Sequence, residues 1–160
     1  MEKLNIICID DQREVLSTIV KDLDVFESFV SLEECESADE AWEVIDEIDA
    51  NGDYVAVVIS DHVMPGKSGV DFLTELNRDQ RFVRTRKMLL TGLATHKDTI
   101  YAINQAGIDF YLEKPWSHQV LVQHVKQMLT HFVLETGLEF QDYMPVLDQD
   151  TLYQELRKRN

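Results

Sequence analysis

Few features of this 160-residue chain point to a secreted, fibrous or membrane protein. Two cysteines, six glycines and three prolines are too few for a disulfide scaffold or a low-complexity segment. No apolar run is long enough to span a membrane, and the first residues form no signal-peptide pattern. We therefore expect a cytoplasmic protein whose two thiols, Cys8 and Cys35, are buried and reduced.

Positive charge is also scarce. Fifteen Lys and Arg residues stand against thirty Asp and Glu residues, which gives a formal net charge of −15. Nucleic acids and anionic membranes both require a basic surface, so we expect neither as a direct partner. The basic triplet at 157–159 is better explained by its position, because cations stabilise the C-terminal end of a helix.

Strand-like and helix-like segments alternate five times along the chain. Apolar residues recur at helical spacing between short runs rich in Ile, Val and Leu, and Ser68, Gly107 and Gly137 stand where helices would begin or end. The strand-like runs are 5–9, 30–36, 55–59, 87–90 and 109–112. This (βα)5 alternation predicts an α/β fold with a doubly wound five-stranded parallel sheet and helices on both faces.

The last residues do not follow this alternation, so we expect one domain at 1–136 and a short C-terminal helical extension at 137–160. The extension is too apolar for a free tail, and Asp150 is placed to cap a helix that contains Leu152 and Leu156. A segment this short cannot form an independent core. We expect it to dock on the main domain, on a second copy or on a partner.

Polar residues follow four of the five strand-like runs. Asp10 and Asp11 follow the first, Asp61 the third, Thr91 the fourth and Lys114 the fifth. In an open parallel sheet the carboxyl ends of the strands meet at one edge, so these side chains should converge. A carboxylate can attack a phosphoryl group, Mg²⁺ prefers oxygen ligands, and an ammonium pairs with a phosphoryl oxygen. The pattern predicts a magnesium-assisted aspartyl phosphorylation site.

Each of these residues has a simpler explanation when it is taken alone. Asp61 is explained as a loop carboxylate that accepts local amides, Asp10 or Asp11 as a helix cap, and Thr91 with Gly92 as a turn. A capping role and a metal-binding role for the Asp10–Asp11 pair are compatible. The occurrence of all of these residues at matched strand ends favours the phosphorylation site.

The chain resembles the receiver domain of bacterial two-component response regulators over about residues 4–135. Four motifs carry the resemblance: Ile9-Asp10-Asp11, Ser60-Asp61-His62-Val63-Met64-Pro65-Gly66, Leu90-Thr91-Gly92 and Tyr111-Leu112-Glu113-Lys114-Pro115-Trp116. The resemblance implies a flavodoxin-like fold and Asp61 as the phosphoacceptor. It also implies that Asp11 and Asp61 bind Mg²⁺ directly, that Asp10 acts through water, and that the carbonyl of Val63 completes the protein ligands.

The same resemblance assigns roles around the phosphoryl group. Thr91 and Lys114 would bind its oxygens, and Thr91 and Tyr111 would act as switch residues. Val63 and Leu93 are apolar where many rapidly dephosphorylating relatives carry polar side chains, which implies a long-lived acyl phosphate. Tyr111 is equally well explained as an ordinary aromatic residue of the sheet.

The resemblance implies a signalling domain and not an enzyme. It would accept a phosphoryl group from a sensor histidine kinase or a phosphotransfer protein and change shape to control a partner or an attached output. The fourth helix, fifth strand and fifth helix would form a possible homodimer face. One alternative is the N-terminal receiver part of a larger cyclic-dinucleotide phosphodiesterase or hybrid signalling protein, because Lys114-Pro115-Trp116 resembles the receivers found in such proteins. Another is a pseudo-receiver that binds partners without phosphorylation.

Two enzyme-like or cofactor-binding classes fit the sequence less well. Phosphatases of the haloacid dehalogenase type place a second Asp two residues after the nucleophile, where this chain has Val63. A flavodoxin-like cofactor protein is disfavoured because no glycine-rich phosphate cradle opens a helix.

Overall fold

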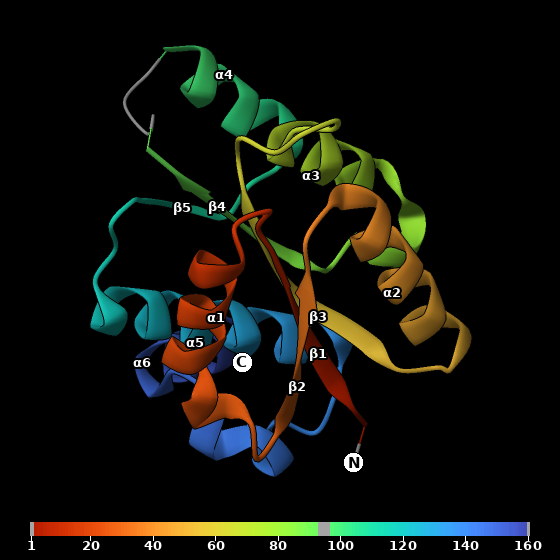
Figure 1. The fold of residues 1–160 in the computed structure, drawn as a ribbon. Helices are drawn as coiled ribbons and strands as arrows, with labels where there is room; N and C mark the ends of the chain where they lie inside the picture. Colours follow the sequence, from red (N-terminus) through yellow and green to blue (C-terminus); the bar gives the residue numbers. More distant parts are fainter. Residues whose placement is uncertain (1, 93–96, 160) are drawn as a thin grey trace.

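Five parallel strands lie at the centre of the molecule in the order β2-β1-β3-β4-β5 (Figure 1). The computed structural model describes residues 2–92 and 97–159. The strands are β1 (Leu4–Ile9), β2 (Val30–Cys35), β3 (Tyr54–Asp61), β4 (Arg86–Thr91) and β5 (Phe110–Glu113). The α-helices are α1 (Arg13–Asp22), α2 (Ala38–Ala50), α3 (Gly69–Arg78), α4 (Lys97–Ala106), α5 (His118–Thr136) and α6 (Gln149–Lys158). Short 3₁₀ helices occur at η1 (Asp24–Phe26), η2 (Gln80–Phe82) and η3 (Phe140–Val146).

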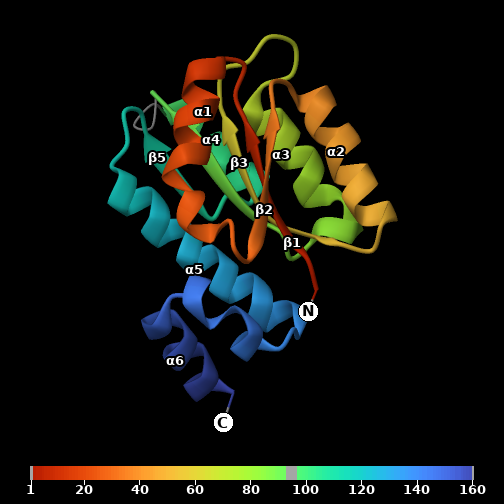
Figure 2. The same cartoon turned by 60° about the horizontal axis from the view of Figure 1, so that its bottom comes forward.

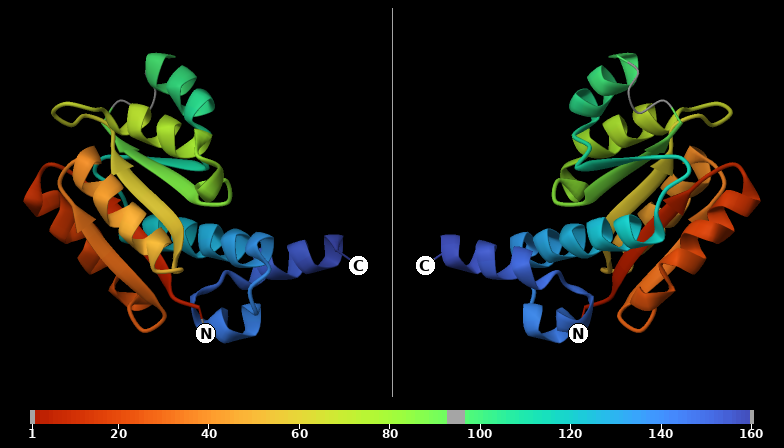
Figure 3. Two further views of the ribbon diagram at one scale, coloured as in Figure 1. Left: turned by 90° about the vertical axis from the view of Figure 1, so that its right-hand side faces the viewer. Right: turned by 90° about the vertical axis from the view of Figure 1, so that its left-hand side faces the viewer.

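Helices cover both faces of the sheet, so the predicted doubly wound α/β fold is confirmed. Helices α1 and α5 lie on one face, and α2, α3 and α4 lie on the other (Figures 1 and 3). Strand β1 is buried along its whole length, with Ile6 and Cys8 in one core and Ile7 and Ile9 in the other. This explains its unbroken apolar run, because both of its faces are shielded from water.

Serine side chains cap the N-termini of α2, α3 and α5. Ser37, Ser68 and Ser117 each accept a hydrogen bond from the backbone N–H three residues further on. Such caps satisfy one of the free donors at a helix N-terminus. Gly107 and Gly137 follow α4 and α5 with φ of 65° and 80°, a left-handed conformation that glycine adopts without steric cost. The predicted start at Ser68 and the two predicted glycine stops are confirmed.

The C-terminal extension packs on α5 and at the end of the sheet where β1 begins (Figure 2). Tyr143 is fully buried, and Val146, Leu147 and Leu152 are nearly so. Tyr143, Val146 and Leu147 share the apolar layer of α1 and α5 with Leu4. The second half of α5 is therefore covered on both its inner and outer sides, and its buried residues are Met128, Leu129, Thr130, Phe132, Val133 and Leu134.

Polar contacts fix the extension to the outer side of α5. The backbone N–H of Asp148 donates to Thr130 Oγ1 at 2.8 Å, and Gln123 Nε2 donates to Asp148 Oδ1 at 2.9 Å. The hydroxyl of Tyr143 donates to the carbonyl of Glu2, just before β1. The expectation that Asp150 caps the last helix is wrong. Asp148 is the cap, because its carboxylate accepts from Thr151 N–H while its own N–H is held by α5.

Within the part of the chain that the structure describes, none of the helices combines the length and the apolar character needed to cross a membrane.

We predict that Tyr143→Ala lowers the free energy of unfolding by about 3–5 kcal/mol, the usual cost of removing a large buried aromatic side chain. Tyr153→Ala is the matched control, because Tyr153 lies in the same extension but is 53% exposed. We expect its effect to stay within about 0.5 kcal/mol. Urea denaturation followed by far-ultraviolet circular dichroism measures both. Equal small effects for the two variants would show that the extension adds nothing to stability.

Candidate functional site

The register of the parallel strands brings the predicted site residues to one edge of the sheet. Ile9 pairs with Ser60, Asp61 with Leu90, and Thr91 with Glu113. Strands β1, β3, β4 and β5 therefore end side by side, with Asp61 and Thr91 as the last residues of β3 and β4 and with Asp10 and Lys114 directly after β1 and β5. Asp10, Asp61 and Thr91 are buried there, whereas Asp11 is exposed to solvent.

Three carboxylates form the acidic part of this site. Asp10, Asp11 and Asp61 each direct one oxygen into a group whose members all lie within 4.8 Å of one another. Oxygen donors at this spacing fit Mg²⁺, which binds through one or two carboxylates and keeps several waters. Asp10 Oδ1 also accepts the backbone N–H of Gln12 at 2.9 Å. The N-cap residue of α1 is Gln12, whose side chain makes no capping hydrogen bond, so neither Asp10 nor Asp11 is the N-cap residue of this helix.

The ammonium group of Lys114 is held between two of these carboxylates. Its Nζ lies 2.7 Å from Asp61 Oδ1 and 3.2 Å from Asp10 Oδ2. The backbone N–H of Lys114 donates to the carbonyl of Thr91 at 3.0 Å, which continues the β4–β5 pairing by one step. Burial alone would lower the pKa of Lys114, but its hydrogen bond to Asp61 and the charges of both carboxylates raise the pKa above its ordinary value.

Asp61 is the carboxylate of the group whose ionised form is disfavoured by its surroundings. Burial is the largest effect and raises its pKa, and repulsion from Asp10 acts in the same direction. The hydrogen bond and charge of Lys114 lower the pKa but do not offset these two effects. The ionised form of Asp61 is therefore held at an electrostatic cost, which a bound cation would relieve.

A tight loop after β3 keeps Asp61 at the open edge. His62 N–H donates to the carbonyl of Leu90 at 3.0 Å, and Gly69 N–H donates to the carbonyl of His62 at 2.9 Å. A Cβ at position 69 would lie 1.9 Å from the backbone oxygen of Asp61, so only glycine fits this closure. Sequence reasoning missed Gly69, although a glycine directly after the capping Ser68 was a visible signal.

The remaining predicted residues lie at different distances from the carboxylates. Val63 is 68% exposed in the loop after Asp61. Tyr111 lies on β5 with about half of its surface exposed, and no contact of the described residues joins its side chain to the carboxylate group. Leu93 lies outside the described residues. Trp116, beyond Lys114, donates its indole N–H to Asp22 of α1 at 2.9 Å, a contact that sequence reasoning did not anticipate.

A model of the response regulator receiver domain family matches residues 6–126. The chain belongs to the response regulator receiver family. The predicted receiver identity and phosphorylation-controlled signalling function are thus confirmed, together with the flavodoxin-like fold. The family consists of signalling domains that bind Mg²⁺ at an acidic pocket and interact with histidine kinases or phosphotransfer proteins. Other domains that are enzymes can be attached to a receiver.

Individual relatives show the extent of the similarity. The chemotaxis protein CheY1 of Helicobacter pylori is 33% identical over 96 residues, which cover 60% of this chain and 73% of that protein. The hydrogenase transcriptional regulatory protein HoxA of Cupriavidus necator is 33% identical over 100 residues, which cover 59% of this chain. The chain spans only 20% of the length of HoxA.

A solved structure shares the fold over most of this receiver. The signal receiver domain of an HD domain-containing protein from Pseudomonas fluorescens Pf-5 has a TM-score of 0.69 and 26% sequence identity. The match covers 82% of this chain and 98% of that chain.

We predict that Asp61→Asn stabilises the receiver at neutral pH by about 0.5–2 kcal/mol, the range usual for single stabilising substitutions. The folded-state pKa of Asp61 is raised, so the penalty of its ionised carboxylate is absent below the ordinary pKa and grows as the pH rises through the folded-state pKa. The advantage of Asn should therefore disappear in acid. Denaturant melts across pH measure it, with the exposed Asp142→Asn as control. A variant that is less stable than the parent at pH 7 would contradict the assigned cost.

Proposed function

We propose that Asp61 is the phosphoacceptor of this receiver and that Asp10, Asp11 and Asp61, with the carbonyl of Val63, hold Mg²⁺. The observation that carries the proposal is the position of Lys114, whose ammonium bridges Asp61 and Asp10 inside the carboxylate group. Three carboxylates and one ammonium at an open sheet edge suit a group that receives and holds a phosphoryl dianion.

The chemistry of the step follows from these residues. A carboxylate oxygen of Asp61 attacks the phosphorus atom of a phosphohistidine or an acyl phosphate, and the bond from phosphorus to the donor atom breaks. When bound, Mg²⁺ supplies positive charge that neutralises the phosphoryl oxygens. Lys114 then exchanges its contact with Asp61 Oδ1 for a phosphoryl oxygen, and the hydroxyl of Thr91 donates to another. These exchanges link phosphorylation to β4 and β5.

We further propose that residues 1–136 form the receiver and that residues 137–160 are an extension docked on it.

We also propose two kinds of partner for this receiver. A sensor histidine kinase or phosphotransfer protein in the cytoplasm would supply the phosphoryl group. A homodimer face on α4, β5 and α5 is supported by exposed apolar side chains, which are Ile100, Tyr101, Tyr111 and Val120. Thr91 and Tyr111 would act as the switch residues.

An attached output domain is a second possibility that one comparison favours. The similar receiver from Pseudomonas fluorescens is part of an HD domain-containing protein. An output of this kind, encoded with or beside the receiver, would turn the phosphorylated state into an activity.

We predict that a small acyl-phosphate donor adds one phosphoryl group to the protein, and that the addition requires Mg²⁺. Asp61→Asn should abolish it, whereas Asp142→Asn should leave it unchanged, because Asp142 is exposed and distant from the carboxylate group. Intact-protein mass spectrometry with and without a chelator measures the addition. Persistent phosphorylation of the Asp61→Asn protein would refute this phosphoacceptor.

We also predict that the acyl phosphate is long-lived and that Val63→Gln shortens its lifetime. Hydrolysis requires a water in line with the bond from Asp61 to phosphorus, and an amide at this exposed position can hold that water. Val83→Gln is the control, since Val83 is similarly exposed but lies beside η2. Phosphoprotein decay after removal of the donor gives the lifetimes. Decay that is unchanged or slower in Val63→Gln would rule out this role.

A further inference from the structure

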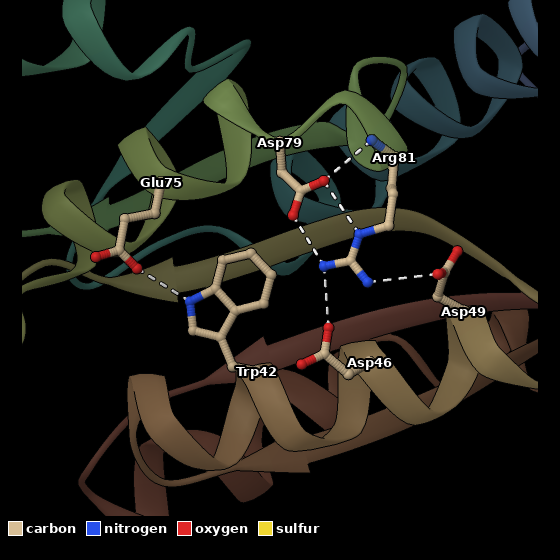
Figure 4. A network of polar contacts seen from close by, with 6 residues as sticks. All are labelled: Trp42, Asp46, Asp49, Glu75, Asp79 and Arg81. Carbon is tan, nitrogen blue, oxygen red and sulfur yellow. Dashed lines mark hydrogen bonds and ion pairs between the residues drawn. The ribbon is translucent and has the colours of Figure 1, made fainter.

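Helix α2 is fastened to the adjacent helices at two separate places (Figure 4). At one place the indole N–H of Trp42 donates to Glu75 Oε1 of α3 at 3.1 Å. At the other, Arg81 of η2 contacts Asp46 at 3.1 Å and Asp49 at 3.4 Å on α2. The two fastenings use separate residues, so one can be removed while the other is left intact.

Only the fastening at Glu75 also reaches the loop that follows Asp61. The second carboxylate oxygen of Glu75 accepts from Lys67 Nζ at 2.5 Å. Lys67 lies four residues after Val63, just before the capping Ser68. Glu75 therefore joins three elements: it lies on α3, it contacts α2 through Trp42, and it contacts the loop through Lys67.

The loop has few other attachments. His62 is held by its backbone, and Met64 is buried among the apolar residues of α2 and α3. Between these points and Ser68 the chain turns through Gly66, with φ of 79°. From the residues that the structure describes, Lys67 supplies the only side-chain hydrogen bond or ion pair that joins 62–67 to another element.

We propose that Glu75 is a positioning residue for the proposed metal site, and that it acts through Lys67 by holding the loop that presents the carbonyl of Val63. The inference rests on the proposed function, because it concerns the Mg²⁺ ligands named there. Glu75 does not touch the reacting atoms. Its effect is to reduce the number of loop conformations in which the Val63 carbonyl is away from the carboxylate group.

The size of the effect follows from the exposure of the pair. The side chains of Lys67 and Glu75 are 32% and 44% exposed, and exposed pairs change an equilibrium by at most about five-fold. The bond from Trp42 fixes Glu75 in advance, so less side-chain freedom is lost when Lys67 binds. The hydrogen bond to Lys67 also lowers the pKa of Glu75, as expected for a carboxylate that is paired with an ammonium. We expect roughly a three-fold effect on metal binding.

A double-mutant cycle tests the proposal on the full chain. Lys67→Met removes the ammonium, and Glu75→Gln removes the charge while its amide oxygen can still accept from Trp42. Binding of Mn²⁺ is measured by electron paramagnetic resonance of the free ion, and Mg²⁺ by competition. Each single variant should bind roughly three-fold more weakly, and the double variant should be no weaker than either, because both changes break one interaction.

Arg81→Met is the matched control. It loosens the other fastening of α2, so it should lower thermal stability without weakening metal binding. Weaker binding in Arg81→Met to the same degree would show that general loosening, and not loop position, is responsible. Single effects that add in the double variant, or no effect at all, would also overturn the role of Glu75.

The experiment separates this inference from the proposed function. If the parent protein binds Mn²⁺ and Asp11→Asn does not, the metal site stands, and the cycle alone decides the role of Glu75. If the parent protein shows no binding, the proposed metal site fails, and the role of Glu75 fails with it. The same variants, phosphorylated at saturating Mg²⁺, should reach the parent rate, because the loop is then held by the ion.

Discussion

The contact of Lys114 with Asp61 and Asp10 is the interaction on which the rest of the site depends. Three carboxylates whose oxygens lie within 4.8 Å of one another repel strongly, and two of them are buried. Lys114 offsets part of that repulsion in the absence of other cations. Its position is set by the backbone, because its N–H continues the pairing of β5 with β4 at Thr91. The sheet itself therefore fixes where the ammonium stands.

The same sheet determines what the site can bind. The parallel pairing aligns the carboxyl ends of β1, β3 and β4, so residues that are far apart in sequence lie together at one edge of the sheet. The loop after Asp61 must then turn sharply to leave that edge open. Gly69 permits the turn, because its backbone contacts the carbonyl of Asp61 where a side chain would collide. Access to the carboxylates thus depends on a residue that has no side chain.

The sequence was sufficient to predict the five strands, the doubly wound sheet and the convergence of the site residues. Those features depend on apolar periodicity and on the geometry of parallel sheets, which are local or general rules. The contact of Trp116 with Asp22 could not be predicted, because it depends on how the segment before α5 lies against the end of α1. The choice of Asp148 over Asp150 as a cap has a similar cause. Both residues suit the role locally, and the contact of the Asp148 N–H with Thr130 selects one of them.

Helix α5 connects the two ends of the molecule that have opposite effects on stability. It begins beside Lys114, at the edge where buried carboxylates are held at a cost, and it ends beneath the C-terminal extension. Tyr143 and Leu147 add apolar burial at that second end, at the opposite edge of the sheet from Asp61. An extension placed there buries its apolar side chains away from the edge where Asp10, Asp11 and Asp61 lie. The extension is held on the outer side of α5 through Gln123 and Thr130, so its polar contacts lie on the same helix that follows Lys114 in the chain.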